Sequence, residues 1–290
     1  MTMIRAGLLL TVLALALVAL LAITRRAQPA GADSVASADP GAEAPGLQPQ
    51  PIHELRNRNL GGGDEYLVRN LLAGPIEVRC ALIKAENVAS NPRLPRRLVV
   101  PARAEFKLTD LRSVEPTLPA IAEIECGAMV GDPNAPAPDG VSYAIPFYPG
   151  TKFTVDQGFA GAYSHHDPES RYSLDLGVPE GTPVIAARGG VVMQVEEDFR
   201  ASGNDARRFG DRSNYVRVLH DDGSLALYAH LAPRTILFRP GDRIRTGNFL
   251  AKSGNTGFST GPHLHFSVQK NAGFALRSIP FAMPGVDTSN

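Results

Sequence analysis

Two histidines separated by one leucine stand near the end of the chain, in the segment GPHLHF at residues 261–266. The alternation of polar and apolar residues over this segment is typical of a β-strand. His263 and His265 would then point to one face of the strand, and Leu264 and Phe266 into a core. Two imidazoles with a fixed separation and a shared direction suit a metal site or a pair of catalytic groups. Taken alone, the motif is equally compatible with a half-exposed strand that happens to carry two histidines.

Further candidate groups lie in the same half of the chain. His165 and His166 stand in an expected loop, Asp175 lies between apolar neighbours, and His230 ends an expected strand. A catalytic zinc ion takes three protein ligands, usually histidine or carboxylate, and leaves one position for water. Further polar groups near that water can position it and stabilise the oxyanion that forms. The side chains available here match three ligands and two such helpers.

Short strands must position these groups. From residue 143 to 284, apolar segments with turn residues between them predict an antiparallel β domain with little helix. Asp221, Asp222 and Gly223 predict a hairpin turn, and the polar stretch 199–211 predicts a surface loop. We expect strands at residues 183–187, 190–196, 214–220, 224–230, 248–253 and 264–269.

The stretch 53–140 predicts a small β-sandwich-like domain, because several short apolar segments are punctuated by turn residues. Cys80 and Cys126 both lie in alternating segments, and an even count in an exported chain favours a disulfide between them. Two buried free thiols are the alternative.

The N-terminal residues predict a segment that directs the chain to export. Arg5 precedes an apolar run at residues 6–23, so residues 1–32 are expected to be either a secretory signal peptide or a membrane anchor. Residues 33–52 contain almost no large apolar side chain and are expected to be a flexible linker. Either interpretation predicts that the remainder of the chain is exported.

The charge composition argues against a nucleic-acid partner. Lys plus Arg and Asp plus Glu both number 29, so the formal net charge is zero. Tryptophan is absent, and glycine and proline are plentiful, which favours strands and turns over long helices.

Between residues 143 and 269, several motifs together resemble the LytM/lysostaphin-type zinc metallopeptidases of the M23 family. Each motif alone is weak, but their combination and order are specific. They are DLGVPEGTPV at 175–184, AARGGVV at 186–192, YAHL at 228–231, GNTG at 254–257 and STGPHLHF at 259–266.

The resemblance implies a role for each candidate. Asp175 and His265 would bind Zn²⁺, whereas His230 and His263 would assist catalysis. Most members place the third ligand four residues before the aspartate, where this chain has Arg171. A subset has a Ser-His farther upstream, which implies His165 as the ligand, with His166 as the competitor.

The resemblance also implies an activity. An exported zinc metalloendopeptidase would hydrolyse peptide bonds in the stems or cross-links of peptidoglycan, in the periplasm or anchored to the inner membrane through residues 6–23. A non-catalytic relative that binds the wall or activates an amidase is the alternative, and a protein substrate is another. The 53–140 domain could occlude the groove, dock a partner or hold the enzyme off the membrane. The sequence leaves the oligomeric state open.

Overall fold

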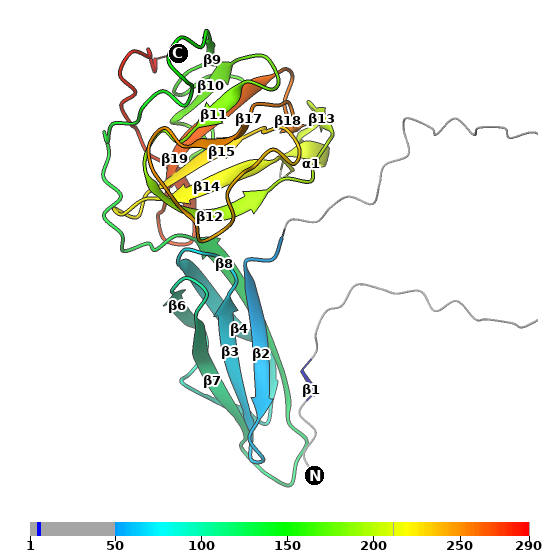
Figure 1. The fold of residues 1–290 in the computed structure, drawn as a ribbon. Coiled ribbons are helices and arrows are strands. Elements are labelled where there is room, and N and C mark those ends of the chain that lie inside the picture. Colours follow the sequence, from blue (N-terminus) through cyan, green and yellow to red (C-terminus); the bar gives the residue numbers. More distant parts are fainter. Residues whose placement is uncertain (1–4, 7–49, 211, 290) are drawn as a thin grey trace, which may run out of the picture. The chain divides into compact units, whose positions relative to one another are not determined.

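The computed structural model describes residues 5–6, 50–210 and 212–289. It consists of 46% strand and 2% helix, which confirms the mainly β fold class (Figure 1). The described residues include one four-residue helix, α1 (Ala206–Phe209), whose N-cap Asp205 accepts from the amide of Arg207. No helix in this part of the chain is long and apolar enough to cross a bilayer. Apart from residues 5–6, the expected targeting segment lies outside the described residues, as does most of the linker.

The first strands form two four-stranded sheets that share one hydrophobic core. One sheet has the order β1-β8-β4-β6 and the other β2-β3-β7-β5. Val68 and Leu108 from one sheet and Val78 and Val100 from the other meet in this core, as predicted for a β-sandwich. The strands are β1 (Arg5–Ala6), β2 (His53–Asn59), β3 (Asp64–Asn70), β4 (Ile76–Glu86), β5 (Val88–Asn91), β6 (Arg96–Val100), β7 (Glu105–Ser113) and β8 (Ile121–Val130).

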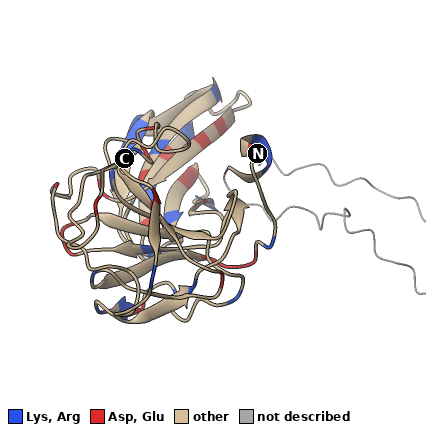
Figure 2. Ribbon diagram, turned by 90° about the horizontal axis from the view of Figure 1, so that it is seen from above, with Lys and Arg blue, Asp and Glu red and all other residues tan. Residues whose placement is uncertain are grey.

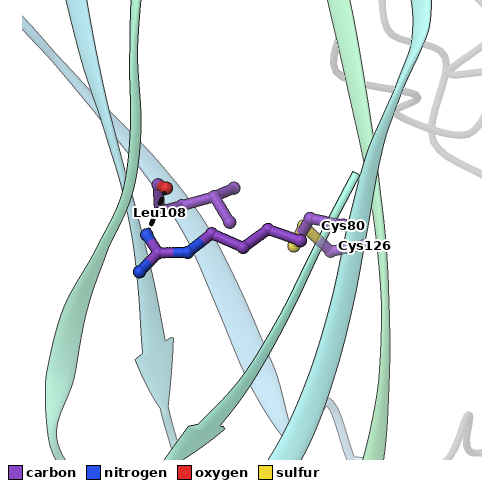
Figure 3. Close-up of a disulfide and its surroundings, with 4 residues drawn as sticks. Cys80, Leu108 and Cys126 are labelled. Atoms are coloured by element: carbon purple, nitrogen blue, oxygen red, sulfur yellow. Dashed lines mark hydrogen bonds between the residues drawn. A yellow bond between two sulfur atoms is a disulfide. The ribbon is translucent and has the colours of Figure 1, made fainter. Parts of the chain in front are cut away.

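The predicted disulfide between Cys80 and Cys126 is confirmed (Figure 3). The two cysteines are direct partners across β4 and β8. Arg96, which pairs with Cys80 on the other side of β4, donates from Nη1 to the carbonyl of Leu108 at 2.8 Å. The covalent link therefore joins strands within one sheet, and the arginine joins that sheet to the other.

The rest of the chain is organised around an eight-stranded antiparallel sheet with the order β16-β12-β14-β15-β19-β10-β9, in which β20 pairs with β19. Two-stranded pairs, β11–β17 and β13–β18, accompany it. Their bounds are β9 (Thr154–Gln157), β10 (Ser173–Gly177), β11 (Pro183–Ile185), β12 (Gly190–Glu196), β13 (Ser202–Gly203), β14 (Tyr215–Leu219), β15 (Leu225–Ala229), β16 (Arg243–Ile244), β17 (Phe249–Lys252), β18 (Gly257–Phe258), β19 (His263–Asn271) and β20 (Leu276–Ser278).

All six strands predicted in this region are present, with ends that differ by up to two residues. The hairpin between β14 and β15 is confirmed, and Gly223 adopts the positive φ of +82° that such a turn requires. The prediction of a plain surface loop over 199–211 was wrong in part, because β13 and α1 form there. Both elements are very short, so hydrophobic periodicity could not reveal them.

Strand alternation gives the large sheet two different faces. Val216, Val218, Leu264 and Phe266 point to one face and are fully buried in the main core. The cross-strand partners Asp175 and His265, by contrast, keep part of their surface exposed on the other face. A one-residue shift in register would exchange these faces, so burial of the apolar set fixes where the polar set points.

In the view of Figure 2, both basic and acidic residues occur along the described strands and loops. The described residues from 50 onward form one compact unit. Its division into domains at 53–140 and 143–284 stays a prediction.

Candidate metal centre

Three side chains predicted as metal ligands come together on the polar face of the large sheet. Asp175 on β10 is the direct cross-strand partner of His265 on β19, and the turn before β10 supplies His165. His265 Nδ1 lies 2.8 Å and His165 Nε2 3.3 Å from Asp175 Oδ1. One ligand atom from each residue lies within 4.8 Å of the other two. Two nitrogens and a carboxylate oxygen are a donor set that zinc accepts.

The His165 ring is prepared to donate a lone pair. Its side chain is fully buried, and Nδ1 lies 2.8 Å from the carbonyl oxygen of Gly158. Because a carbonyl only accepts, Nδ1 carries a proton, and in the neutral ring Nε2 carries the lone pair. Nε2 is buried and makes no hydrogen bond. A buried nitrogen left without a partner beside a carboxylate fits a metal ligand.

His166, the competing candidate, points away from this cluster. Its side chain is 62% exposed, and its Nε2 lies 3.7 Å from the carboxylate of the neighbouring Asp167. The structure therefore brings His165 and not His166 to Asp175 and His265.

His230 and His263, the two predicted catalytic residues, lie beside the three candidate ligands. Their ring centroids are 4.7 Å apart, and the His230 ring is 5.8 Å from that of His265. Nδ1 of His230 donates to the carbonyl of Thr256 at 2.7 Å, and Nδ1 of His263 to that of Gly261 at 2.8 Å. In the neutral form of each ring Nε2 is thus the acceptor. His263 Nε2 lies 3.8 Å from Asp175 Oδ1.

The backbone at His230 is unusual for a residue with a side chain. Its φ is +60°, in the left-handed region. A buried network holds this conformation: Asn214 donates to the carbonyl of Leu231 at 3.1 Å, and Thr256 donates to the same carbonyl at 2.9 Å. Strained backbone tends to occur at functional sites. Asn214 was not predicted as a site residue, because a lone asparagine at the start of an expected strand carries no signal.

Burial and neighbouring charged groups shift the pKa values of the cluster residues, and for Asp175 and His165 the two effects act in opposite directions. Burial would raise the pKa of Asp175, but the neighbouring imidazoles of His165 and His265 lower it well below its usual range. Burial disfavours the charged form of His165, yet the carboxylate of Asp175 raises its pKa overall. Burial and the neighbouring rings of His263 and His265 lower the pKa of His230 to about 3. At neutral pH, Asp175 is therefore ionised and His230 is neutral.

The cluster opens into a pocket of about 530 Å³ that also contains both predicted catalytic histidines. At its rim, the rings of Tyr163 and Phe258 stack with centroids 6.1 Å apart. The hydroxyl of Ser259 lies 3.3 Å from His263 Nδ1.

His220 lies away from the cluster and has a structural environment. It is 2% exposed, its Nδ1 lies 2.8 Å from the carbonyl of Gly189, and its ring packs edge-on against Tyr143. It is therefore not part of the candidate site.

Comparison with known proteins agrees with this geometry. Residues 169–275 match the family described as Peptidase family M23. An uncharacterized metalloprotease of Haemophilus influenzae is 35% identical over 115 residues, 40% of this chain and 22% of that protein. The peptidoglycan DD-endopeptidase ShyA of Vibrio cholerae is 34% identical over 94 residues, 32% of this chain and 19% of that protein.

A solved mutant catalytic domain of the prophage-encoded M23 protein EnpA from Enterococcus faecalis is 25% identical, with a TM-score of 0.35. The match covers 48% of this chain and 94% of that domain. The chain spans about a fifth of the length of the two curated relatives. The matched segment contains Asp175, His230, His263 and His265, and His165 lies four residues before it. Residues 169–275, which contain four of the five candidate site residues, are thus similar to the peptidases of family M23.

Proposed function

We propose that this chain is a zinc metalloendopeptidase that hydrolyses peptide bonds in the stems or cross-links of peptidoglycan. One observation carries the proposal: His165, Asp175 and His265 present three ligand atoms within 4.8 Å, beside two more histidines in one pocket. The relatives add the chemical direction, since one of them is named as a peptidoglycan DD-endopeptidase.

In this proposal His165, Asp175 and His265 hold the metal ion through Nε2, a carboxylate oxygen and Nδ1. When bound, zinc lowers the pKa of a water molecule and polarises a carbonyl group. Asp175 is ionised, and the buried Nε2 of His165 has no competing hydrogen bond. Both features favour a cation at this position.

His230 and His263 supply the acid–base chemistry. Each ring is held through Nδ1 on a backbone carbonyl and faces the pocket with Nε2 as acceptor. His230 is neutral at pH 7, so its Nε2 can accept a proton from a water molecule in the pocket. Once protonated, a ring can donate a hydrogen bond to the charge that develops on the carbonyl oxygen, or a proton to the leaving amine.

We further propose that the protein acts in the bacterial cell envelope, either free in the periplasm or anchored to the inner membrane. The apolar run at residues 6–23, which follows Arg5, supports export, as does the disulfide between Cys80 and Cys126. Peptidoglycan is the peptide polymer available in that compartment.

The test is digestion of purified peptidoglycan with zinc-loaded protein, followed by mass analysis of the released fragments. Release of peptides with new amino and carboxyl termini supports the proposal and identifies the bond. If the zinc-loaded protein releases nothing but still sediments with the polymer, the non-catalytic alternative is correct. Cleavage of a glycine-rich or elastin-like peptide without cleavage of peptidoglycan would show that the substrate is a protein and not peptidoglycan.

A further inference from the structure

A buried glutamine links two of the candidate metal ligands. Gln157 ends β9, is 8% exposed, and lies opposite Asp175 across β9 and β10. Its Oε1 accepts from the backbone amides of Tyr163 at 2.9 Å and Ser164 at 3.2 Å. Its Nε2 donates to Asp175 Oδ2 at 3.0 Å and to the hydroxyl of Ser164 at 2.7 Å.

The orientation of this amide is determined by its partners. Two backbone N–H groups converge on one atom of the Gln157 side chain, so that atom is the carbonyl oxygen. The NH₂ group must then face Asp175 and Ser164. Every strong hydrogen-bonding direction of the amide is used, which leaves the side chain one orientation.

The hydrogen bond from Gln157 gives the two carboxylate oxygens of Asp175 different partners. Gln157 occupies Oδ2, while Oδ1 faces His265 Nδ1 at 2.8 Å and His165 Nε2 at 3.3 Å. A neutral donor on Oδ2 fixes the carboxylate plane without cancelling its charge. One oxygen is therefore aimed at the position where the three ligand atoms converge.

The contacts with Tyr163 and Ser164 place the other ligand. These two residues immediately precede His165, so anchoring their amides fixes where the His165 side chain starts. Gly158, the residue that follows β9, completes the arrangement, because its carbonyl oxygen lies 2.8 Å from His165 Nδ1. Two consecutive residues thus control the position and the tautomer of His165.

The packing leaves little freedom for this glutamine to move. A Cβ at Gly161 would lie 2.1 Å from Gln157 Cγ, so glycine is required there by close approach. Glutamate at position 157 would lack the donor for Asp175, and lysine would lack the acceptor for the amides. Asparagine is one methylene shorter and could not span both partners.

We propose that Gln157 is a positioning residue that sets Asp175 and His165 in the metal-binding arrangement before the metal arrives. This inference rests on the proposed function, since it requires a metal at the cluster. Partners of this kind around a metal site typically change metal affinity by about 10–100-fold when they are removed.

The test is Gln157→Met, which keeps the length and volume of the side chain but removes all of its hydrogen bonds. The matched control is Gln194→Met. Gln194 is also 8% exposed, but it lies on β12, which pairs with β14 and β16 and not with the strands that carry Asp175 and His265. Zinc affinity is measured by competition with a chromophoric chelator, and Co²⁺ binding by visible absorption.

We expect Gln157→Met to weaken zinc binding by about 10–100-fold and to shift the Co²⁺ absorption bands, with Gln194→Met unchanged in both. If both variants weaken zinc equally, the effect is general loosening of the fold and the inference is wrong. Wild-type affinity and spectrum in Gln157→Met would also overturn it.

A second variant covers the case in which Gln157→Met does not fold. Gly161→Ala keeps the glutamine but forces its Cγ and Cδ to move. It should also weaken zinc binding. A folded Gly161→Ala protein with wild-type zinc affinity would count against the inference. Failure of the wild type itself to bind zinc would instead reject the proposed function.

Discussion

The sandwich and the large sheet each contain a buried carboxylate, and the partners of these two carboxylates differ. Glu77 on β4 has a fully buried side chain, and the guanidinium groups of Arg79, at 3.2 Å, and Arg97 neutralise it. Asp175 on β10 is nearly as buried, but it faces histidines, and Nε2 of His165 beside it has no hydrogen bond. A structural carboxylate is satisfied by permanent cations. The arrangement around Asp175 instead leaves room for a cation that is not part of the chain.

The same contrast applies to the two sheet systems. In the sandwich, inward faces of two sheets meet in one apolar core, and a disulfide fixes two neighbouring strands. In the large sheet, one face is buried in the main core, and the other carries the histidine cluster. One region is built for stability, and the other positions reactive groups on a rigid support.

The largest expected effect comes from changing one of the two carboxylates. Asp175→Asn should abolish stoichiometric zinc binding and reduce peptide release to the level of the metal-free protein, because the amide carries no charge. Glu77→Gln is the same chemical change in the sandwich and should leave zinc content at wild-type level. Atomic absorption on both purified variants checks this. Equal zinc loss in both would remove the distinction between the two regions.

The two histidines of β19 should separate metal binding from catalysis. His263→Ala is expected to keep zinc but to lower turnover by about 10²–10⁴-fold, the usual contribution of a general acid or base. His265→Ala should lose the metal and the activity together. Parallel measurements of zinc content and peptide release decide the matter, and zinc loss in His263→Ala would show that the assignment of roles is wrong.

Removal of the disulfide should act on stability alone. Replacing Cys80 and Cys126 by alanine frees a loop that spans 46 positions, and we expect the free energy of unfolding to fall by about 2–4 kcal/mol. Zinc affinity under native conditions should stay unchanged, since neither cysteine contacts the cluster. Denaturant titration and zinc competition test the two statements. A tenfold change in zinc affinity would contradict the second.

His220 should make the large sheet sensitive to acid independently of the metal site. Burial, together with the charge of Arg188, lowers its pKa from 6.5 to about 4, although the hydrogen bond to the Gly189 carbonyl and the charges of Asp222 and Asp221 act in the opposite direction. The folded state therefore binds a proton less readily than the unfolded state. The stability due to neutral His220 is complete above pH 6.5 and is lost as the pH falls toward 4, by up to about 3 kcal/mol.

Metal-free protein and its His220→Gln variant should be unfolded by denaturant at pH 7.5, 5.5 and 4. The difference in stability between the two proteins reports the contribution of His220, because the histidines of the cluster are present in both. Wild type should lose more stability than the variant between pH 7.5 and 4. Parallel losses would show that His220 is not responsible.

Much of the fold follows from local pattern. Alternation predicted β12, β14, β15 and β19, and Asp221–Gly223 predicted the hairpin, because a half-buried strand has a strong period of two. Strands β9 and β10 were not predicted. Both are short, and in β9 residues such as Thr154, Asp156 and Gln157 lack the apolar alternation that marks a strand.

The candidate site was predicted to a similar extent. Motif order supplied Asp175, His230, His263 and His265 as candidates, and left His165 and His166 as competitors. Gln157 and Asn214 had no signal at all, since each acts through partners that are distant or irregularly spaced in the sequence. Their roles depend on contacts such as Gln157 with Asp175, which are 18 positions apart.

The sequence by itself determined which residues are chemically able to act and which face of each strand they share. His263 and His265 point to one side because side chains alternate along a strand, whatever the rest of the fold does. Only the tertiary structure decided that Asp175 lies opposite His265, that His165 is buried beside them and His166 is exposed, and that Gln157 bridges the two. Those choices depend on strand pairing and loop packing, which join residues far apart in the chain.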